Sequence, residues 1–433
     1  MNLRKITNFD YLLLLTVLSL SFIGILFIYS SGVNSAGVLV SEEYKKQILW
    51  VCTGIILIIL SSLYDYRKIR DRTSLIYIAG ILILIYTVIF GASRNHAKSW
   101  LGSKEIGVQP SEFMKIVFII FLSYYLDKSK NEKPLKRFIK AIAIMFAPML
   151  LILAQPDLGT ASVYIPIFLI MCFIAGIPLR FLTYFFCFGI LTIIFTLMPL
   201  WEEVILKQPF VMSKILKNSQ ISLIIFFSLG ACVIIAMIGN VVLRRRYYYW
   251  IAYIFSIVTF SFAGSILGMR ALKPYQMMRL IIFLNPEVDP YDSGWNIIQS
   301  ITAIGSGGLS GRGFLMGPQS HYRYLPVQST DFIFSILSEE WGFFGGVLVF
   351  ALYGILFLRL FISIKRCEDF FGKLIISGIL TMFFFHFMVN VGMVMGIMPI
   401  TGIPLLFLSY GGSSLWTAMI AAGIVAGINL RQL

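Results

Sequence analysis

The chain has 433 residues, of which 58% are hydrophobic and only 13% carry a charge. A soluble domain carries about 25% charged residues, so this composition, with its mean hydropathy of +0.87, excludes one. It predicts an all-α polytopic integral membrane protein, with residues 1–433 forming a single transmembrane domain. The net charge of +15 is spread over short loops, which indicates orientation in a membrane and no nucleic-acid partner.

Apolar runs long enough to cross a bilayer recur along the sequence, and we predict a helical bundle with about 12 transmembrane helices. The first run follows Arg4 and Lys5 and exceeds a typical signal-peptide core, so we expect a retained anchor. The run at 332–364 is long enough to contain a break. The predicted spans are residues 11–30, 46–63, 74–90, 112–126, 138–154, 159–177, 180–200, 221–242, 248–267, 332–364, 372–396 and 404–428.

Lys and Arg cluster in alternate loops, which is typical of the cytoplasmic side of a membrane protein. An even number of spans then places both termini in the cytoplasm. The loops with unusual polar content all fall on the outer side, so an active site would face outward. These outer loops are residues 91–111, 155–160, 201–220, 268–331 and 397–403, with 268–331 as one large extracytoplasmic loop.

The metal-ligating residue types show no pattern of a metal site. The three histidines are scattered, and the five cysteines lack ligand spacing and lie in apolar runs or a cytoplasmic loop. We therefore assign no metal ligands, and we expect the cysteines to be small buried side chains.

Asp331 stands at the start of an apolar segment, in the sequence STDFIFS. Ser329 or Thr330 could cap a helix that begins here, and a carboxylate in its first turn would also suit the helix dipole. Helical steps of four would align Asp331, Ser335 and Glu339 on one stripe. Ionisable groups at membrane depth tend to be functional, and a carboxylate shielded from water suits a general base.

Two further motifs place charge at the outer ends of spans. In QPSEFMK, Glu112 suits the first turn of a helix, but Lys115 one turn deeper must pair, snorkel or bind an anion. Pairing with Glu112 is the simplest explanation. In QPDLGT, Asp157 either caps the next helix or belongs to a site.

Glycine-rich and small-residue stretches flank these charges. The run AIGSGGLSGRGFLMG has no strand–turn–helix context, so it predicts a flexible or re-entrant segment lining a polar cavity and not a nucleotide loop. Arg279, Arg312 and Arg323 flank it and could hold an anionic head group. The stretch at 390–414 is consistent with close helix packing.

Together, these motifs resemble the SEDS family (shape, elongation, division and sporulation), and within it the elongation branch, the RodA type. The matching stretches run in order along the chain: WLG, QPSEFMK, QPDLGT, FLNPEVDP, IIQSITAIGSGG, STDFIFS followed by Glu339 and Glu340, and TGIPLLFLSYGGSS. Val327 and Ser99 depart from the family's usual Glu and Arg. Residues 201–267 look like an insertion carrying two extra transmembrane segments.

The resemblance implies a peptidoglycan glycosyltransferase that polymerises lipid II during cell elongation, with a class B penicillin-binding protein, a transpeptidase, as partner. It also implies that the chain lies in the cytoplasmic (inner) membrane of a bacterium, among membrane lipids. It implies Asp331 as the essential acid, which we expect to be the general base. The substrate-binding residues that it implies are Trp100, Glu112, Lys115, Asp157, Arg279, Gln299, Ser300 and Thr330.

A divalent cation, Mg²⁺ or Mn²⁺, is a candidate cofactor, because the reaction must stabilise a pyrophosphate leaving group. The alternative function is a lipid-linked precursor flippase or other transporter, which would move the head group without reacting with it. Transporters tend to place charge near the midplane and to show repeat symmetry, whereas the polar residues here gather at the outer face. An inactive scaffold is a third reading, disfavoured by the polar outer loops.

Overall fold

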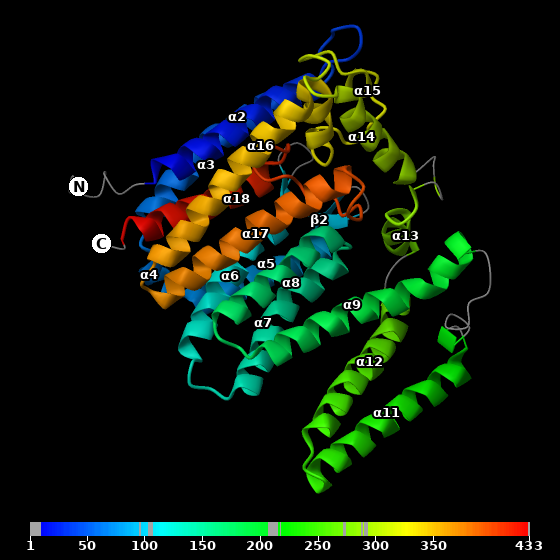
Figure 1. Ribbon diagram of the computed structural model, residues 1–433. Helices are drawn as coiled ribbons and strands as arrows, with labels where there is room; N and C mark the ends of the chain where they lie inside the picture. The colour runs from blue at the N-terminus through cyan, green and yellow to red at the C-terminus, as the bar shows by residue number, and fades with distance from the viewer. Residues whose placement is uncertain are drawn as a thin grey trace. The chain divides into compact units, whose positions relative to one another are not determined.

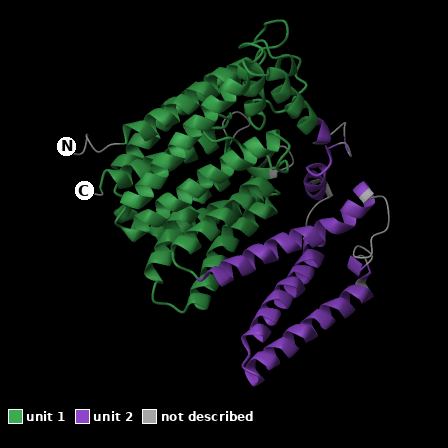
Figure 2. Ribbon diagram, in the orientation of Figure 1, with its two compact units in different colours: residues 1–177, 296–433 green, residues 178–295 purple. Residues whose placement is uncertain are grey.

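The computed structural model describes residues 10–94, 97–102, 107–206, 215–216, 218–271, 274–286, 289 and 293–431. The basic residues Arg4 and Lys5 lie outside this range. The chain forms two compact units, residues 1–177 with 296–433 and residues 178–295 (Figure 2). We describe each by itself.

The first unit is a helical bundle with a small three-stranded antiparallel sheet of order β1-β2-β3. Most of α14 (Ser293–Gly307) belongs to it as well. Its other elements are α2 (Tyr11–Ser31), α3 (Glu43–Leu63), α4 (Tyr66–Arg70), α5 (Thr73–Phe90), β1 (Ala92–Arg94), β2 (Ala97–Gly102), β3 (Gly107–Val108), α6 (Pro110–Lys128), α7 (Pro134–Ala154), α8 (Leu158–Ile174), α15 (Pro318–His321), α16 (Ile333–Arg366), α17 (Phe370–Val394) and α18 (Gly412–Asn429).

Helices α17 and α18 form the centre of this unit, with 78% of the apolar window of each buried. Figure 1 shows them between α2 and α3 on one side and α5 to α8 on the other. Their sequences are apolar on all faces, which is typical of buried helices. Gly423 of α18 lies so close to α3 that an added Cβ would meet Ser61 Oγ at 2.0 Å. Small residues thus allow the two helices to touch.

Each predicted span overlaps a helix, which confirms the prediction of a polytopic helical membrane protein. Within the described residues, ten helices are long and apolar enough to cross a membrane. The other two predicted spans are α6, which carries four charged residues, and α8, which has 17 residues. The chain is a multi-pass membrane protein.

The predicted cytoplasmic loops of the first unit meet at one end of the bundle. Asp127 pairs with Arg70 at 2.5 Å and with Lys130 at 2.8 Å. The Tyr66 hydroxyl donates to Asp369 Oδ2 at 3.0 Å. These contacts join loops that are far apart in sequence, as the shared side of a membrane requires.

Both described chain ends lie at this same end of the bundle. Asp10, which caps α2, pairs with Arg359 of α16 at 2.9 Å. Arg431, after α18, lies 3.8 Å from Asp65, beside α4. The polar loops predicted to face outward, as far as this unit contains them, are at the opposite end (Figure 1).

The predicted break in the 332–364 run occurs at Gly342, whose φ of 63° and ψ of −156° interrupt α16. The break leaves helix carbonyls and amides without intrahelical partners. The glycine-rich segment supplies them: amides of residues 312–313 donate to carbonyls of residues 339–340 at 2.9 and 3.0 Å. In return, amides of residues 343–344 donate to carbonyls of residues 308–309 at 2.9 and 3.2 Å. The glycine-rich segment therefore supplies the hydrogen-bond partners that the break in α16 leaves open, and we call this contact the patch on α16.

The second unit contains α9 (Leu179–Trp201), the π-helical turn η1 (Glu202–Leu206), α11 (Ser219–Val242), α12 (Arg246–Ala271) and α13 (Pro274–Ile282). Helix α12 packs against both α9 and α11, around Phe195, Leu216 and Phe262. Only 11% of the apolar window of α11 is buried. The two extra segments expected at 201–267 are α11 and α12, although the reading of this region as an insertion stays a prediction.

Gly311 tests the patch on the α16 break. Its φ is +81°, and a Cβ there would meet Glu340 O at 2.0 Å. We expect Gly311→Ala to lower the free energy of unfolding by at least about 2 kcal/mol, through backbone strain and the clash. The measurement is thermal unfolding of the purified chain in detergent. Gly305→Ala is the control, since nothing lies within 4 Å of its Cβ position. Equal stability of the two variants would contradict the patch.

Candidate functional site

Asp331 lies in a turn just before α16 and is half-buried. The helix begins at Ile333, with Phe332 as N-cap and no side-chain cap. The prediction that Ser329 or Thr330 caps this helix is wrong, because the Thr330 hydroxyl donates to Val327 O at 3.3 Å instead. The turn closes on Val327, whose φ is +51° and whose carbonyl also accepts from the amide of Asp331.

The predicted stripe of Asp331, Ser335 and Glu339 is also wrong, since Asp331 precedes the helix. The Ser335 hydroxyl bonds Ser300 Oγ at 2.7 Å. The Glu339 carboxylate accepts from the amides of Gln319 at 2.8 Å and Ser320 at 3.2 Å. Glu339 therefore holds the start of α15.

The backbone of Asp331 is fixed by its neighbours in space. Three consecutive carbonyls, of residues 329–331, accept in turn from Tyr410 N at 2.8 Å, Ser409 Oγ at 2.5 Å and Asn390 Nδ2 at 3.0 Å. The side chain lies beside Gly402, where an added Cβ would be 3.6 Å from Asp331 Oδ2. The carboxylate is thus held against the segment that joins α17 to α18.

A buried ion pair occupies the N-terminal end of α6. Lys115 Nζ lies 2.8 Å from Glu112 Oε2, and the two side chains are 1% and 4% exposed. The predicted pairing is confirmed. A buried ammonium needs such a partner, because removing one member of a buried pair leaves an uncompensated charge.

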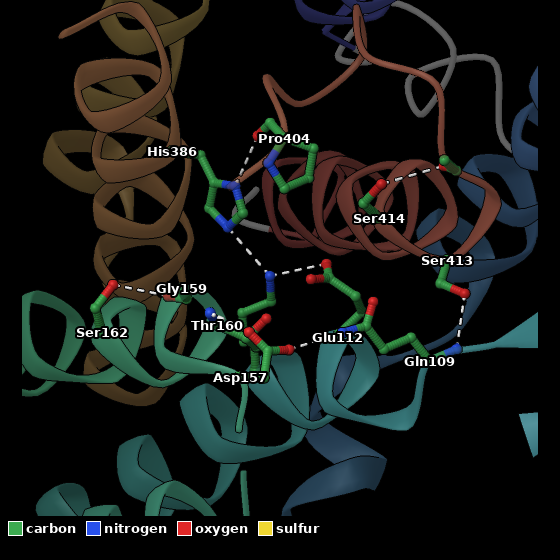
Figure 3. Close-up of polar contacts among 12 residues, drawn as sticks. Gln109, Glu112, Asp157, Gly159, Thr160, Ser162, His386, Pro404, Ser413 and Ser414 are labelled. Atoms are coloured by element: carbon green, nitrogen blue, oxygen red, sulfur yellow. Dashed lines mark hydrogen bonds and ion pairs between the residues drawn. The ribbon is translucent and has the colours of Figure 1, made fainter. Parts of the chain in front are cut away.

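His386 of α17 is the second partner of this ammonium, at 3.1 Å from Lys115 Nζ to Nε2. Its Nδ1 lies 3.0 Å from the carbonyl oxygen of Pro404 (Figure 3). A carbonyl only accepts, so Nδ1 carries the proton and Nε2 accepts from the ammonium. The ring is therefore neutral and in one tautomer. Sequence reasoning missed His386, which lies within an apolar run.

Asp157 caps the next helix, as one of its two predicted readings expected. It caps α8 by accepting from the amide of Thr160 at 3.0 Å, and its other oxygen accepts from Gln109 Nε2 at 2.8 Å (Figure 3). The backbone N–H of Gln109 donates to Ser413 Oγ at 2.9 Å, and Ser413 lies at the start of α18. Gln109, which the sequence interpretation did not single out, thus links α6, α8 and α18.

The segment at 401–411 connects the Asp331 turn with the polar ends of α6 and α8. Asn390 donates to both Asp331 O and Ile403 O. His386 lies one turn earlier on α17 and is bonded to the carbonyl of Pro404, the residue after Ile403. Gly159, beside Asp157, lies so close that a Cβ would meet Thr401 O at 2.4 Å. We name residues 401–411 the bridging segment. The sequence indicated only helix packing here.

Four other residues predicted to bind substrate either lie away from Asp331, Lys115 and Asp157 or make contacts that join helices. Trp100 is half-buried in β2, where it pairs with Ala92, and Gln299 is half-buried on α14. Ser300 is buried and donates to Val394 O at 2.7 Å, which joins α14 to α17. Arg279 is exposed on α13, in the second unit. The described residues contain no group of three or more His, Cys, Asp or Glu arranged to hold a metal ion.

Comparison with known proteins places the chain beside cell-wall enzymes. The family model FtsW/RodA/SpoVE, described as cell cycle protein, matches residues 10–217 and 206–432. The chain is 60% identical to the peptidoglycan glycosyltransferase RodA of Treponema pallidum, over all of both chains. It is 32% identical to the stage V sporulation protein E of Bacillus subtilis, over 98% of both chains. It is 29% identical to the peptidoglycan glycosyltransferase MrdB of Escherichia coli, over 98% of this chain and 94% of the relative.

Solved structures share the fold. A chain from a study of polymerization and crosslinking by a peptidoglycan synthase complex matches with a TM-score of 0.66 at 23% identity, over 98% of both chains. The Thermus thermophilus rod shape determining protein RodA matches with a TM-score of 0.60 at 21% identity, over 97% of this chain and 96% of the other.

The bridging segment makes a prediction about stability. Asn390→Leu removes two hydrogen bonds and leaves the buried carbonyl of Ile403 without this donor, so we expect unfolding free energy to fall by roughly 2–5 kcal/mol. Thermal unfolding in detergent measures it. Ser377→Ala on the same helix is the control, because among the described residues its hydroxyl bonds only the carbonyl of Lys373. A loss no larger than the control's would refute the role of Asn390.

Proposed function

The chain belongs to the FtsW/RodA/SpoVE family of cell cycle proteins, and on this basis we propose that it polymerises lipid II into glycan strands during cell elongation, with Asp331 as general base. It is a peptidoglycan glycosyltransferase, like the RodA and MrdB relatives that carry that name. The observation that supports the catalytic proposal most is the carboxylate of Asp331, held against the bridging segment that also binds His386 beside Lys115.

The reaction joins the C4 hydroxyl of one sugar to the anomeric carbon of another that bears a lipid pyrophosphate. Asp331 accepts the proton of the attacking hydroxyl as the new C–O bond forms. The bond from the anomeric carbon to the pyrophosphate oxygen breaks, and the lipid pyrophosphate leaves with the electron pair. Direct attack inverts the anomeric centre.

Lys115 stabilises the negative charge that develops on the leaving pyrophosphate. The Glu112 carboxylate balances the positive charge of the buried Lys115 ammonium while no substrate is bound. The neutral His386 ring fixes the direction of this ammonium and adds no charge. Asp157 and Gln109 orient the ends of α8 and α6 around it. Trp100, Arg279, Gln299, Ser300 and Thr330 remain proposed substrate contacts.

A divalent cation, Mg²⁺ or Mn²⁺, remains a candidate for the pyrophosphate. The described residues offer no cluster of three metal-ligating side chains, so such an ion would take most of its ligands from phosphate oxygens and water. We route no step of the reaction through it.

The transporter alternative is disfavoured. The full-length relative at 60% identity is named a glycosyltransferase. The Asp331 turn, the Glu112–Lys115 pair and Asp157 lie at helix ends on one side of the first unit, whereas transport sites lie near the midplane.

We infer that this polar end faces outward from the bacterial cytoplasmic (inner) membrane and that both termini are cytoplasmic. The basic loops gathered at the opposite end support this orientation. A class B penicillin-binding protein, which would crosslink the strands, is the proposed partner. The chain from the peptidoglycan synthase complex shares the fold and supports this in outline.

Replacement of Asp331 tests the general base. Asp331→Asn keeps the backbone bonds that hold the turn but removes the proton acceptor, so we expect glycan polymerisation to fall by about 10²–10⁴-fold. The assay is strand formation from lipid II by the purified chain in detergent, with and without a candidate transpeptidase. Detergent offers no second compartment, so any polymer also argues against a transporter. A wild-type rate in the Asn variant would exclude Asp331 as base.

Replacement of His386 tests how Lys115 is positioned. The glutamine side chain carries an amide NH2 that can donate to Pro404 O and a carbonyl oxygen that can accept from Lys115, so we expect His386→Gln to keep most activity. His386→Leu leaves Lys115 without this acceptor, and we expect kcat to fall at least about tenfold with little change in KM. Steady-state kinetics on lipid II give both values, and thermal unfolding shows whether the fold is kept. Equal kcat in the two variants would remove His386 from the mechanism.

A further inference from the structure

A basic cavity lies within the second unit, at the ends of α9, α11 and α12. Its volume is about 540 Å³, and its lining is Arg180, Asn240, Arg244, Arg246, Tyr249 and Trp250. The lining contains three guanidinium groups and no carboxylate. None of the three arginines is in an ion pair with any residue that the structure describes.

The position of Arg244 is unusual for its residue type. It follows the end of α11 with a φ of +48°, in the left-handed region where helices commonly place glycine. A non-glycine residue there costs roughly 1–2 kcal/mol, and such strain tends to cluster at functional sites. The turn holds the backbone of Arg244 at the cavity, between the end of α11 and Arg246 at the start of α12.

The third arginine comes from a different helix, which a polar contact fixes in place. The Tyr253 hydroxyl of α12 donates to the carbonyl of Arg180 at 2.7 Å and lies 2.8 Å from Thr183 Oγ1. The first turn of α9 is thus bonded to the second turn of α12. The guanidinium groups therefore converge on one cavity from separate, mutually fixed elements.

The surroundings of the cavity are those of a membrane interface. Helix α11 is apolar and exposes large side chains, such as Ile234, Ile238 and Val242, that need lipid around them. The arginines stand at the basic end of these helices, and Tyr249 and Trp250 are residue types enriched at the headgroup level. Basic pockets between membrane helices at this level suit acidic lipid head groups.

We propose that this cavity binds the phosphodiester head group of an anionic phospholipid. Guanidinium groups bind phosphate oxygens through paired hydrogen bonds. The exposed apolar faces beside the cavity accommodate the acyl chains, which a soluble phosphate compound lacks. This site is separate from the proposed polymerisation chemistry and does not depend on it.

The test is lipid binding by the purified full-length chain. The chain is exchanged into phosphatidylcholine nanodiscs with or without phosphatidylglycerol, and retained lipid is counted by native mass spectrometry after release. We expect the chain to retain phosphatidylglycerol specifically. Each of the variants Arg180→Gln, Arg244→Gln and Arg246→Gln should weaken this retention roughly tenfold, because each removes one charge-assisted hydrogen bond. Arg245→Gln is the matched control, because Arg245 neighbours two of these residues but does not line the cavity.

Three outcomes would overturn the proposal. The first is retention that Arg245→Gln weakens as much as the lining variants do, which would indicate only general surface charge. The second is loss of the bound lipid on adding inorganic phosphate, which would identify a soluble phosphate site. The third is no preference for phosphatidylglycerol over phosphatidylcholine. Thermal unfolding and polymerisation, unchanged in all four variants, verify that each variant is folded.

Discussion

The structure of the first unit depends on hydrogen bonds between α17 and the bridging segment at 401–411. Asn390 and His386, one helical turn apart, bind the successive carbonyls of Ile403 and Pro404. Each of the two side chains makes one further bond. Asn390 donates to the backbone carbonyl of Asp331, and His386 accepts from the ammonium of Lys115. The side chains of Asn390, His386 and Lys115 are buried, so the loss of one of these bonds leaves a buried polar atom with no water to replace its partner. One helix thus sets the positions of the acid and the cation.

The sequence predicted the helices well, because apolar length alone decides whether a segment can cross a bilayer. It also predicted the Glu112–Lys115 pair, since a lysine in an apolar run needs a near neighbour. It failed at Asp331, where serine and threonine suggested a helix cap but their carbonyls are instead held by Ser409 and Tyr410. Contacts between residues about 80 positions apart leave no local pattern.

His386 and Asn390 could have been found. They are polar residues four positions apart within one apolar span, which places them on one face of a helix inside the membrane. The glycine-rich segment at 303–317 was predicted less well, for a different reason. Its glycines suggested flexibility, but Gly311 and Gly342 allow two backbones to approach and close the break in α16. Composition alone does not separate a mobile glycine from one that packs.

The bridging segment also couples the Asp331 turn to the buried pair on α6. The Asp331 turn, His386 and the start of α8 all rest on the same eleven residues. A displacement of this segment would move the Asp331 turn and, through His386, the Lys115 ammonium at the same time. The two groups would therefore shift as one unit and not independently of each other.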